Sequence, residues 1–309
     1  MSRWDWFVLK SKFLLRRLLL VVRDWPVEHR IGDIALRLPL SHKLPIDDAA
    51  APGRSDNLAR IAQAVHAHKK SLLFIDIGAN VGDTVAVLRK NSRFPILAIE
   101  GDAEYYAYLQ RNMSGVADVW TYQGLLSDCP QTSPGELLPN YGGSKQVALR
   151  ADAAETLRFL TLVEVLDKFP QFKNAGMIKI DTDGFDCKII RGARPWLEAA
   201  RPVLFFEYDP YHLAEQGDDG LSIFETLRSI GYSGLLVFEG NGDFMFSLEL
   251  LQKGLLEEMH CYFLGGRPRK YADLCAFHSS DSDVFERCRS GERHFARMAG
   301  SQFHPNTTG

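Results

Sequence analysis

The chain has 309 residues, of which 46% are hydrophobic and 24% are charged. This composition supplies a sizeable core and excludes an intrinsically disordered protein. The formal net charge of −3 argues against a protein that coats nucleic acid with its whole surface, and we expect no nucleic-acid partner. The five cysteines follow no zinc-binding or redox spacing, which is typical of free thiols in a reducing compartment. We therefore expect a cytoplasmic protein.

The first 25 residues form a basic, amphipathic segment. Apolar residues such as Trp4, Val8 and Leu15 recur at helical spacing, and lysines and arginines flank the apolar face. The charges lie within the apolar stretch, which is not the order of a signal peptide, and no stretch is apolar enough to predict a spanning helix. Two interpretations stay open: a helix docked on its own domain or on a second subunit of a homo-oligomer, or a helix lying on the anionic inner face of a membrane.

Strand and helix patterns alternate along most of the chain. Continuous apolar runs typical of buried parallel strands occur at 72–77, 96–99, 177–180 and 203–207. Helical patterns separate these runs, which predicts an α/β fold of the Rossmann-like, doubly wound type with a mostly parallel sheet. A hairpin pattern at 235–246 and an apolar run at 274–277 predict an antiparallel strand near the C-terminus.

The same patterns divide the chain into three parts. Residues 1–54 are an N-terminal amphipathic helix with an accessory segment, residues 55–248 are the Rossmann-like core, and residues 249–309 are a C-terminal extension that completes the core. Residues 131–155 have weak periodicity and several prolines and glycines. We interpret them as a long loop that acts as a lid or contacts the substrate.

The first buried strand ends in a glycine-containing turn within FIDIGANVGDT. Ligands of open α/β sheets bind beyond the carboxyl ends of the strands. Gly78, Asn80 and Gly82 follow a G-x-N-x-G pattern, which differs from the loops of dinucleotide enzymes and of P-loop proteins. Asp76 before the turn suits a positively charged ligand better than a phosphate. Glu100 ends the next strand, where its carboxylate can accept hydrogen bonds from both hydroxyls of a ribose. The glycine-containing turn and Glu100 together indicate an adenosine-type ligand.

Over about residues 55–240 these stretches resemble the FkbM-type S-adenosylmethionine-dependent methyltransferases, a family with a class I Rossmann-like fold. The stretches that carry the resemblance are FIDIGANVGDT, LAIEGDAEYYAYLQRNM, LLSD, MIKIDTDGFDCKIIRGA and PVLFFEY. The most specific of them contains the pattern KID-x-x-G-x-x-x-x-I-x-x-G-A. The chain departs from the family at Asp183 and Asp186, where the family usually has glutamate. Each carboxylate therefore has a shorter reach.

The resemblance implies S-adenosyl-L-methionine as the cofactor. It also implies methylation of a hydroxyl on a carbohydrate, such as a glycan or polysaccharide, or on another natural product. The residues that it assigns to the cofactor are Asp76, Gly78, Asn80 and Gly82 at the methionine end, Glu100 at the ribose, and Ser127 and Asp128 beside the adenine. Asp181 would lie at the strand end nearest the sulfonium.

Methyl transfer from a sulfonium is an in-line displacement, to which orientation contributes roughly 7–11 kcal/mol and a general base about 10²–10⁴-fold. Asp181 is the first candidate for a catalytic group, followed by Glu207 and His212 after the next strand. The alternatives are a helix-capping role for Asp181 and a surface location for His212. We interpret Asp183 and Asp186 as caps. Because residues 181–186 lack both a calcium-loop pattern and a nearby histidine, we predict no metal site.

Two other functions stay open. One is a Rossmann-fold, NAD-dependent oxidoreductase that acts on a sugar nucleotide, and the missing third glycine of the dinucleotide pattern argues against it. The other is a non-catalytic, membrane-associated scaffold that uses residues 1–25 as its anchor.

Overall fold

The computed structural model describes residues 16, 20–69, 71–140, 143–266 and 269–303. The predicted amphipathic helix of residues 1–25 lies mostly outside this part of the chain, and both interpretations of it stay predictions. No helix in the described ranges has the length and apolar character needed to cross a membrane.

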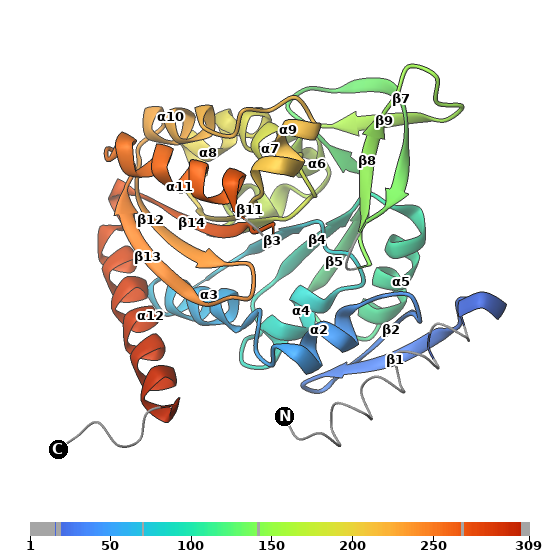
Figure 1. Cartoon of the computed structure of the whole chain (residues 1–309), viewed down its shortest axis with the longest axis horizontal. Helices are drawn as coiled ribbons and strands as arrows, with labels where there is room; N and C mark the ends of the chain where they lie inside the picture. Colours follow the sequence, from blue (N-terminus) through green and yellow to red (C-terminus); the bar gives the residue numbers. More distant parts are fainter. Residues whose placement is uncertain (1–15, 17–19, 70, 141–142, 267–268, 304–309) are drawn as a thin grey trace.

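An eight-stranded sheet forms the centre of the fold, with strand order β13-β12-β14-β11-β10-β3-β4-β5 (Figure 1). Its strands are β3 (Phe74–Ile77), β4 (Ile96–Glu100), β5 (Val119–Gln123), β10 (Met177–Ile180), β11 (Val203–Tyr208), β12 (Tyr232–Glu239), β13 (Phe244–Glu249) and β14 (Ala272–His278). The strands from β11 to β5 are parallel, which confirms the predicted mostly parallel sheet. β14 is antiparallel to both of its neighbours, and β13 is antiparallel to β12.

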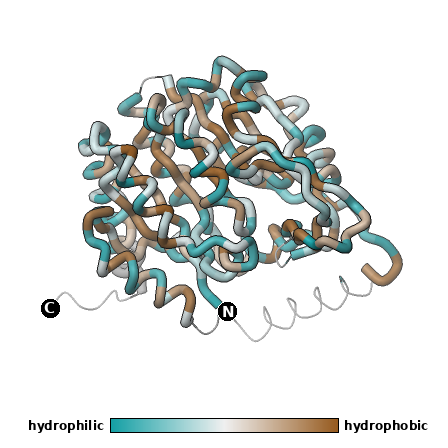
Figure 2. The backbone as a smooth tube through the Cα atoms, turned by 90° about the horizontal axis from the view of Figure 1, so that it is seen from above, coloured by the Kyte–Doolittle hydropathy of each residue, from teal (hydrophilic) through white to brown (hydrophobic). Residues whose placement is uncertain are grey.

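Helices cover both faces of this sheet because alternate residues of the buried strands point to opposite sides. Ile75 belongs to one hydrophobic cluster, with α6, α7, α8 and α10, and Phe74 belongs to the other, with α3, α4, α5 and α12. The hydrophobic strand residues run through the middle of the molecule (Figure 2). The helices are α2 (Leu44–Ala50), α3 (Asp56–His68), α4 (Asp83–Arg89), α5 (Ala103–Met113), α6 (Leu162–Lys168), α7 (Asp186–Gly192), α8 (Arg194–Ala200), α9 (Pro210–Glu215), α10 (Ser222–Ser229), α11 (Lys253–Gly265) and α12 (Ser282–Phe303), with the short 3-10 helices η1 (Pro170–Asn174) and η2 (Ser279–Asp281).

The prediction of a long loop at 131–155 was wrong. This segment supplies β7 (Gln131–Pro139) and β8 (Lys145–Leu149) to a four-stranded sheet of order β6-β9-β7-β8, together with β6 (Leu125–Leu126) and β9 (Thr156–Leu160). Pro134 and Pro139 hide the strand pattern in the sequence, but Pro134 lies where the partner of β7 changes from β9 to β8, and Pro139 is the last residue of β7. Asn140 after β7 and Ser144 before β8 line a cavity at the carboxyl ends of the large sheet.

The accessory segment before the core contains regular structure. β1 (Pro26–Ile31) and β2 (Ile34–Pro39) form an antiparallel hairpin. α2 follows the hairpin and ends at Ala50. These elements place residues 42–58 beside the carboxyl ends of the parallel strands, where they line a cavity.

Candidate functional site

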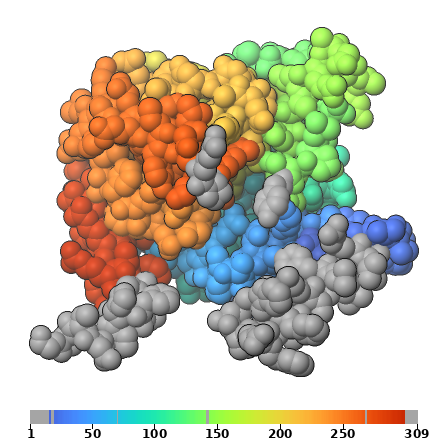
Figure 3. Space-filling view, viewed as in Figure 1, coloured from blue at the N-terminus to red at the C-terminus, as the bar shows by residue number. Residues whose placement is uncertain are grey.

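Two cavities open at the carboxyl ends of the parallel strands. The smaller cavity has a volume of about 70 Å³ and reaches Glu100 at the end of β4. The larger cavity has a volume of about 530 Å³ and reaches Glu207 at the end of β11. Figure 3 shows the hollow between the blue, green and orange parts of the chain. The cavities are adjacent, because the same five residues line both of them: Gly78, Asn80, Ser144, Asp181 and Asp183.

The glycine turn after β3 brings backbone from two strands into close contact. Gly78 has a φ of +79°, and a Cβ atom there would lie 1.7 Å from the backbone oxygen of Asp181. Asn80 has a φ of +48°, a left-handed conformation that asparagine tolerates better than most residues. Only glycine fits at position 78, so the loop after β3 and the turn after β10 form one surface between the cavities.

The carboxylate of Glu100 is held by the same turn. One oxygen accepts a hydrogen bond from the backbone N–H of Asn80 at 2.8 Å, and the other accepts one from Asp102 N–H at 2.7 Å. Burial raises the pKa of Glu100 to about 7, although both backbone N–H groups lower it. Each oxygen retains a lone pair. The side chain can therefore bind a further hydrogen-bond donor in the smaller cavity.

Asp76 and Gly82, predicted to contact the cofactor, line neither cavity. Asp76 is fully buried, and its carboxylate lies 3.5 Å from Nζ of Lys179, which is 3.1 Å from Asp181 on its other side. Burial raises the pKa of Asp76 to about 6, and Lys179 opposes this shift. Burial alone would lower the pKa of Lys179, but Asp181 and Asp76 raise it. Gly82 precedes α4 with a φ of +93° and packs against Met113.

The predicted adenine residues, Ser127 and Asp128, also lie outside the two cavities. Ser127 is buried and its hydroxyl donates a hydrogen bond to the exposed Asp128 at 3.0 Å. Leu125 and Leu126, immediately before them, do line the smaller cavity. The contact of Ser127 and Asp128 with an adenine ring stays a prediction.

The three carboxylates in and next to the turn between β10 and α7 make different contacts. Asp186 accepts hydrogen bonds from the backbone N–H and hydroxyl of Thr182 and from Gly184 N–H, so it holds the turn together. Asp183 caps no helix. Its φ is +51°, and its carboxylate accepts a hydrogen bond from Asn140 at 2.9 Å. Asp181 lines both cavities, with 46% of its side chain exposed.

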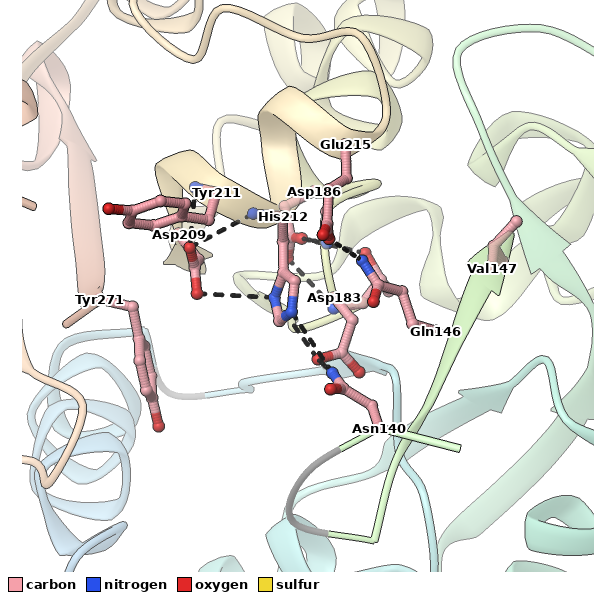
Figure 4. A network of polar contacts seen from close by, with 12 residues as sticks. Asn140, Gln146, Val147, Asp183, Asp186, Asp209, Tyr211, His212, Glu215 and Tyr271 are labelled. Carbon is pink, nitrogen blue, oxygen red and sulfur yellow. Dashed lines mark hydrogen bonds and ion pairs between the residues drawn. The ribbon is translucent and has the colours of Figure 1, made fainter. Parts of the chain in front are cut away.

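His212 lies beside Asp183 in the wall of the larger cavity (Figure 4). It is only 7% exposed, so the surface location considered from the sequence was wrong. Its Nδ1 atom lies 3.7 Å from Asp183 and 3.6 Å from Asp209. Asp209 caps α9 through Tyr211 N–H and binds Arg269 at 2.7 Å.

Glu207 lies in the same cavity at the end of β11. Burial raises its pKa well above the ordinary value, and the carboxylates of Asp181 and Asp183 raise it further. Glu207, Asp183 and His212 each place one ligand atom within 4.8 Å of the other two. The sequence analysis considered only residues 181–186 and no histidine near them, whereas the fold brings His212 of α9 and Glu207 of β11 beside Asp183.

Several cavity residues come from segments that the sequence did not mark as functional. His42 lies beside Asn80, with Nε2 3.1 Å from the amide oxygen. Arg54 donates a hydrogen bond to the hydroxyl of Tyr271 at 3.2 Å. Burial raises the pKa of Asp273 on β14 to about 7. These residues come from the accessory hairpin region and from the C-terminal extension, and only the fold brings them together.

A Rossmann-like sheet with a glycine turn after β3 and an acidic residue at the end of β4 defines a nucleotide-binding class of α/β protein. Residues 76–233, about half of the chain, match the family model described as a methyltransferase FkbM domain. The chain therefore belongs to the FkbM family of S-adenosylmethionine-dependent methyltransferases, which confirms the resemblance seen in the sequence. Family membership argues against the oxidoreductase alternative. No curated protein matches the chain.

Solved structures of methyltransferases are similar to the chain at low identity. The FkbM methyltransferase of Methylobacillus flagellatus is 16% identical with a TM-score of 0.39, and the match covers 54% of this chain and 40% of that one. The METTL16 methyltransferase domain is 13% identical with a TM-score of 0.44, covering 79% and 73%. An O-methyltransferase from Bacillus cereus in complex with SAH is 12% identical with a TM-score of 0.37, covering 76% and 88%. The chain thus spans less than half the length of the FkbM structure.

Proposed function

We propose that the chain binds S-adenosylmethionine in the smaller cavity and transfers its methyl group to a hydroxyl of an acceptor in the larger cavity. The observation that carries the proposal is the junction of the two cavities at Gly78, Asn80 and Asp181. A donor on one side and an acceptor on the other meet at such a junction, as a direct transfer requires.

Glu100 supports the placement of the cofactor. Its two oxygens accept backbone hydrogen bonds and can still accept the two ribose hydroxyls, and charge-assisted hydrogen bonds contribute about 1.5–3 kcal/mol each. The smaller cavity is far below the roughly 300 Å³ of an ordinary ligand site. Cofactor binding therefore requires side chains to move apart. Lys145 lines this cavity and binds Asp102 and Glu104 at 3.0 Å, and we expect it to shift.

The charge at the junction suits a sulfonium. Asp181 and Asp183 line both cavities, and both are acidic. A positive sulfur beside partly buried carboxylates is stabilised by Coulomb attraction that bulk water would screen. The uncharged product thioether loses this attraction, which favours its release.

The larger cavity suits a hydroxyl-rich acceptor without negative charge. Its volume of about 530 Å³ is within the usual range for small-molecule sites. The acidic residues that line it are Asp47, Asp48, Asp83, Asp181, Asp183, Glu207, Asp209 and Asp273, against the basic Arg54, Lys179 and Arg269. Carboxylates accept hydrogen bonds from sugar hydroxyls and repel anions, and Tyr271 adds an aromatic surface. We propose a carbohydrate or a similar polyol as the acceptor.

In the proposed reaction the acceptor oxygen attacks the methyl carbon in line with the carbon–sulfur bond. That bond breaks, its electron pair stays on sulfur, and the hydroxyl proton passes to a base. Asp181, at the junction, is the first candidate for the base, and Glu207 and His212 are the others. Glu207 and His212 line only the larger cavity, so their substitution should lower turnover more than cofactor affinity.

Transfer of radiolabelled methyl groups tests the proposal. The full chain is incubated with methyl-labelled S-adenosylmethionine and a panel of neutral, cationic and anionic oligosaccharides. We expect label in a neutral or cationic acceptor, in an ether that resists mild alkali. Label in an alkali-labile ester or on nitrogen would contradict hydroxyl methylation, and preference for an anionic acceptor would contradict the assignment of the larger cavity.

A further inference from the structure

One corner of the larger cavity brings together a histidine and two carboxylates from two separate stretches of the chain. Asp183 follows β10, Glu207 ends β11, and His212 lies in α9. One ligand atom from each residue lies within 4.8 Å of the other two, and all three residues line the same cavity. Figure 4 shows His212 between Asp183 and Asp209.

Two atoms of this group are buried without a hydrogen-bond partner. His212 is 7% exposed, and its Nδ1 atom makes no hydrogen bond, since the nearest carboxylate oxygens are at 3.6 and 3.7 Å. Oε2 of Glu207 is also buried and has no hydrogen-bond partner. Buried polar atoms are almost always satisfied. Two unsatisfied atoms in one group of neighbouring residues indicate that a ligand completes the group.

The charge of the group points to a cation. Among the residues that the structure describes, no lysine or arginine forms an ion pair with Asp183 or Glu207. The basic side chains nearby are engaged elsewhere: Arg269 binds Asp209, and Lys179 lies between Asp76 and Asp181. Asp183 and Glu207 therefore lie close together without a basic side chain beside them, which disfavours having both ionised unless a cation binds.

We propose that Asp183, Glu207 and His212 bind a divalent first-row metal ion. Two carboxylate oxygens and one imidazole nitrogen are ligands that Mn²⁺ and Zn²⁺ accept, whereas Mg²⁺ and Ca²⁺ prefer oxygen ligands alone. Three protein ligands leave positions open toward the cavity, as in catalytic metal sites. Asn140 donates to Asp183 at 2.9 Å and so orients one ligand.

The role of this ion rests on the proposed hydroxyl methylation. An acceptor hydroxyl bound to the metal becomes more acidic. Its oxygen gives an electron pair to the methyl carbon, the carbon–sulfur bond breaks with its pair on sulfur, and the hydroxyl proton goes to a base. Because Glu207 and His212 then act as ligands, Asp181 is the group that accepts this proton.

Titration of Mn²⁺ into the untagged full chain after EDTA treatment tests the site. Free Mn²⁺ gives a six-line electron paramagnetic resonance signal, which bound Mn²⁺ loses. We expect one ion per chain, competition by Zn²⁺, and little competition by Mg²⁺. Glu207→Gln and His212→Gln should each weaken binding at least tenfold. Asp273→Asn removes a carboxylate from the same cavity outside the group, and it should change the affinity less than threefold.

Thermal unfolding of each variant separates lost binding from lost folding. Mn²⁺ should raise the melting temperature of the unmodified chain and of Asp273→Asn, but not of Glu207→Gln. No binding at millimolar Mn²⁺ and Zn²⁺ by folded protein would overturn the inference, as would equal binding by all variants. Binding of S-adenosylhomocysteine is measured separately on the same samples. Metal binding without S-adenosylhomocysteine binding would support the metal site and count against the proposed function. Binding of S-adenosylhomocysteine without metal binding would contradict the metal site alone.

Discussion

The carboxylate of Glu100 accepts a hydrogen bond at 2.8 Å from the backbone N–H of Asn80, and so ties the end of β4 to the loop after β3. The same loop contacts the turn after β10 through Gly78. One half-buried acid therefore holds the cofactor side of the junction in place and also lines the smaller cavity. Its loss should affect ligand binding and local structure together.

Replacing Glu100 with glutamine removes its charge and turns one acceptor into a donor. Loss of one charge-assisted hydrogen bond costs about 1.5–3 kcal/mol, which corresponds to roughly 10–150-fold weaker binding of S-adenosylhomocysteine. Isothermal titration measures this affinity. Glu104→Gln, on the exposed side of α5, is the matched control and should bind normally. Equal affinity of Glu100→Gln and the unmodified chain for S-adenosylhomocysteine would contradict the assignment of Glu100 to the ribose.

Cofactor affinity should rise with pH. Burial raises the pKa of Glu100 to about 7 in the ligand-free chain. Only the ionised carboxylate accepts both ribose hydroxyls, so binding below this pKa must release a proton. Affinity for S-adenosylhomocysteine should then fall by up to tenfold per pH unit below 7 and level off above 8. Glu100→Gln should flatten this dependence, and a flat profile in the unmodified chain would contradict the assignment.

Stability of the ligand-free chain should change with pH in the opposite direction. Burial raises the pKa of Asp186 and of Asp273 to about 7, from values near 4 in the unfolded chain. The folded state then binds more protons than the unfolded state between pH 4 and 7, so stability falls as pH rises through this window. Melting temperatures from pH 5 to 8 check this. Asp273→Asn should make the decline shallower, and rising stability up to pH 8 would contradict it.

Lys179 compensates two carboxylates in the centre of the sheet. Lys179→Met leaves Asp76 buried without a counter-charge, and we expect a loss of about 3–5 kcal/mol in the free energy of unfolding, measured in urea. The double variant Lys179→Met with Asp76→Asn removes both charges and should recover much of this loss. Additive losses in the double variant would show that the two side chains do not interact.

The contact between Gly78 and Asp181 should tolerate no side chain. A Cβ atom at Gly78 would lie 1.7 Å from a backbone oxygen, so Gly78→Ala should cost roughly 2–4 kcal/mol of stability. It should also abolish binding of S-adenosylhomocysteine. Gly115 has no atom within 4 Å of an added Cβ, and Gly115→Ala is the control. Normal cofactor binding by Gly78→Ala would contradict the proposed junction.

Local sequence patterns predicted the large sheet and the ends of β3 and β4, which meet at the smaller cavity. Buried strands are continuous apolar runs, and the positions of Gly78 and Glu100 follow directly from where β3 and β4 end. Asp76 is a different case. An acid before a glycine turn suggested contact with a ligand, but the register of β3 and β10 pairs it with Lys179 instead. This pairing depends on strand order, which no local pattern contains.

The larger cavity was the least predictable part of the molecule. Its walls come from α2, the turn after β10, α9 and β14, which are far apart in the sequence. Asp183 was interpreted as a cap because it is close to a helix start, and only the packing of α9 against this turn brings it near His212. The strands at 131–149 were not predicted, because their prolines and polar residues mask the alternation of apolar and polar residues that is typical of a strand.

Calorimetric titration of the full chain with S-adenosylhomocysteine tests the central claim most directly. We predict one site per chain, with a dissociation constant in the range of about 1 µM to 1 mM that is usual for enzyme ligands, and at least tenfold weaker binding to Glu100→Gln. Absence of heat from a folded sample at high micromolar concentration, confirmed by an unchanged melting temperature at millimolar ligand, would contradict it.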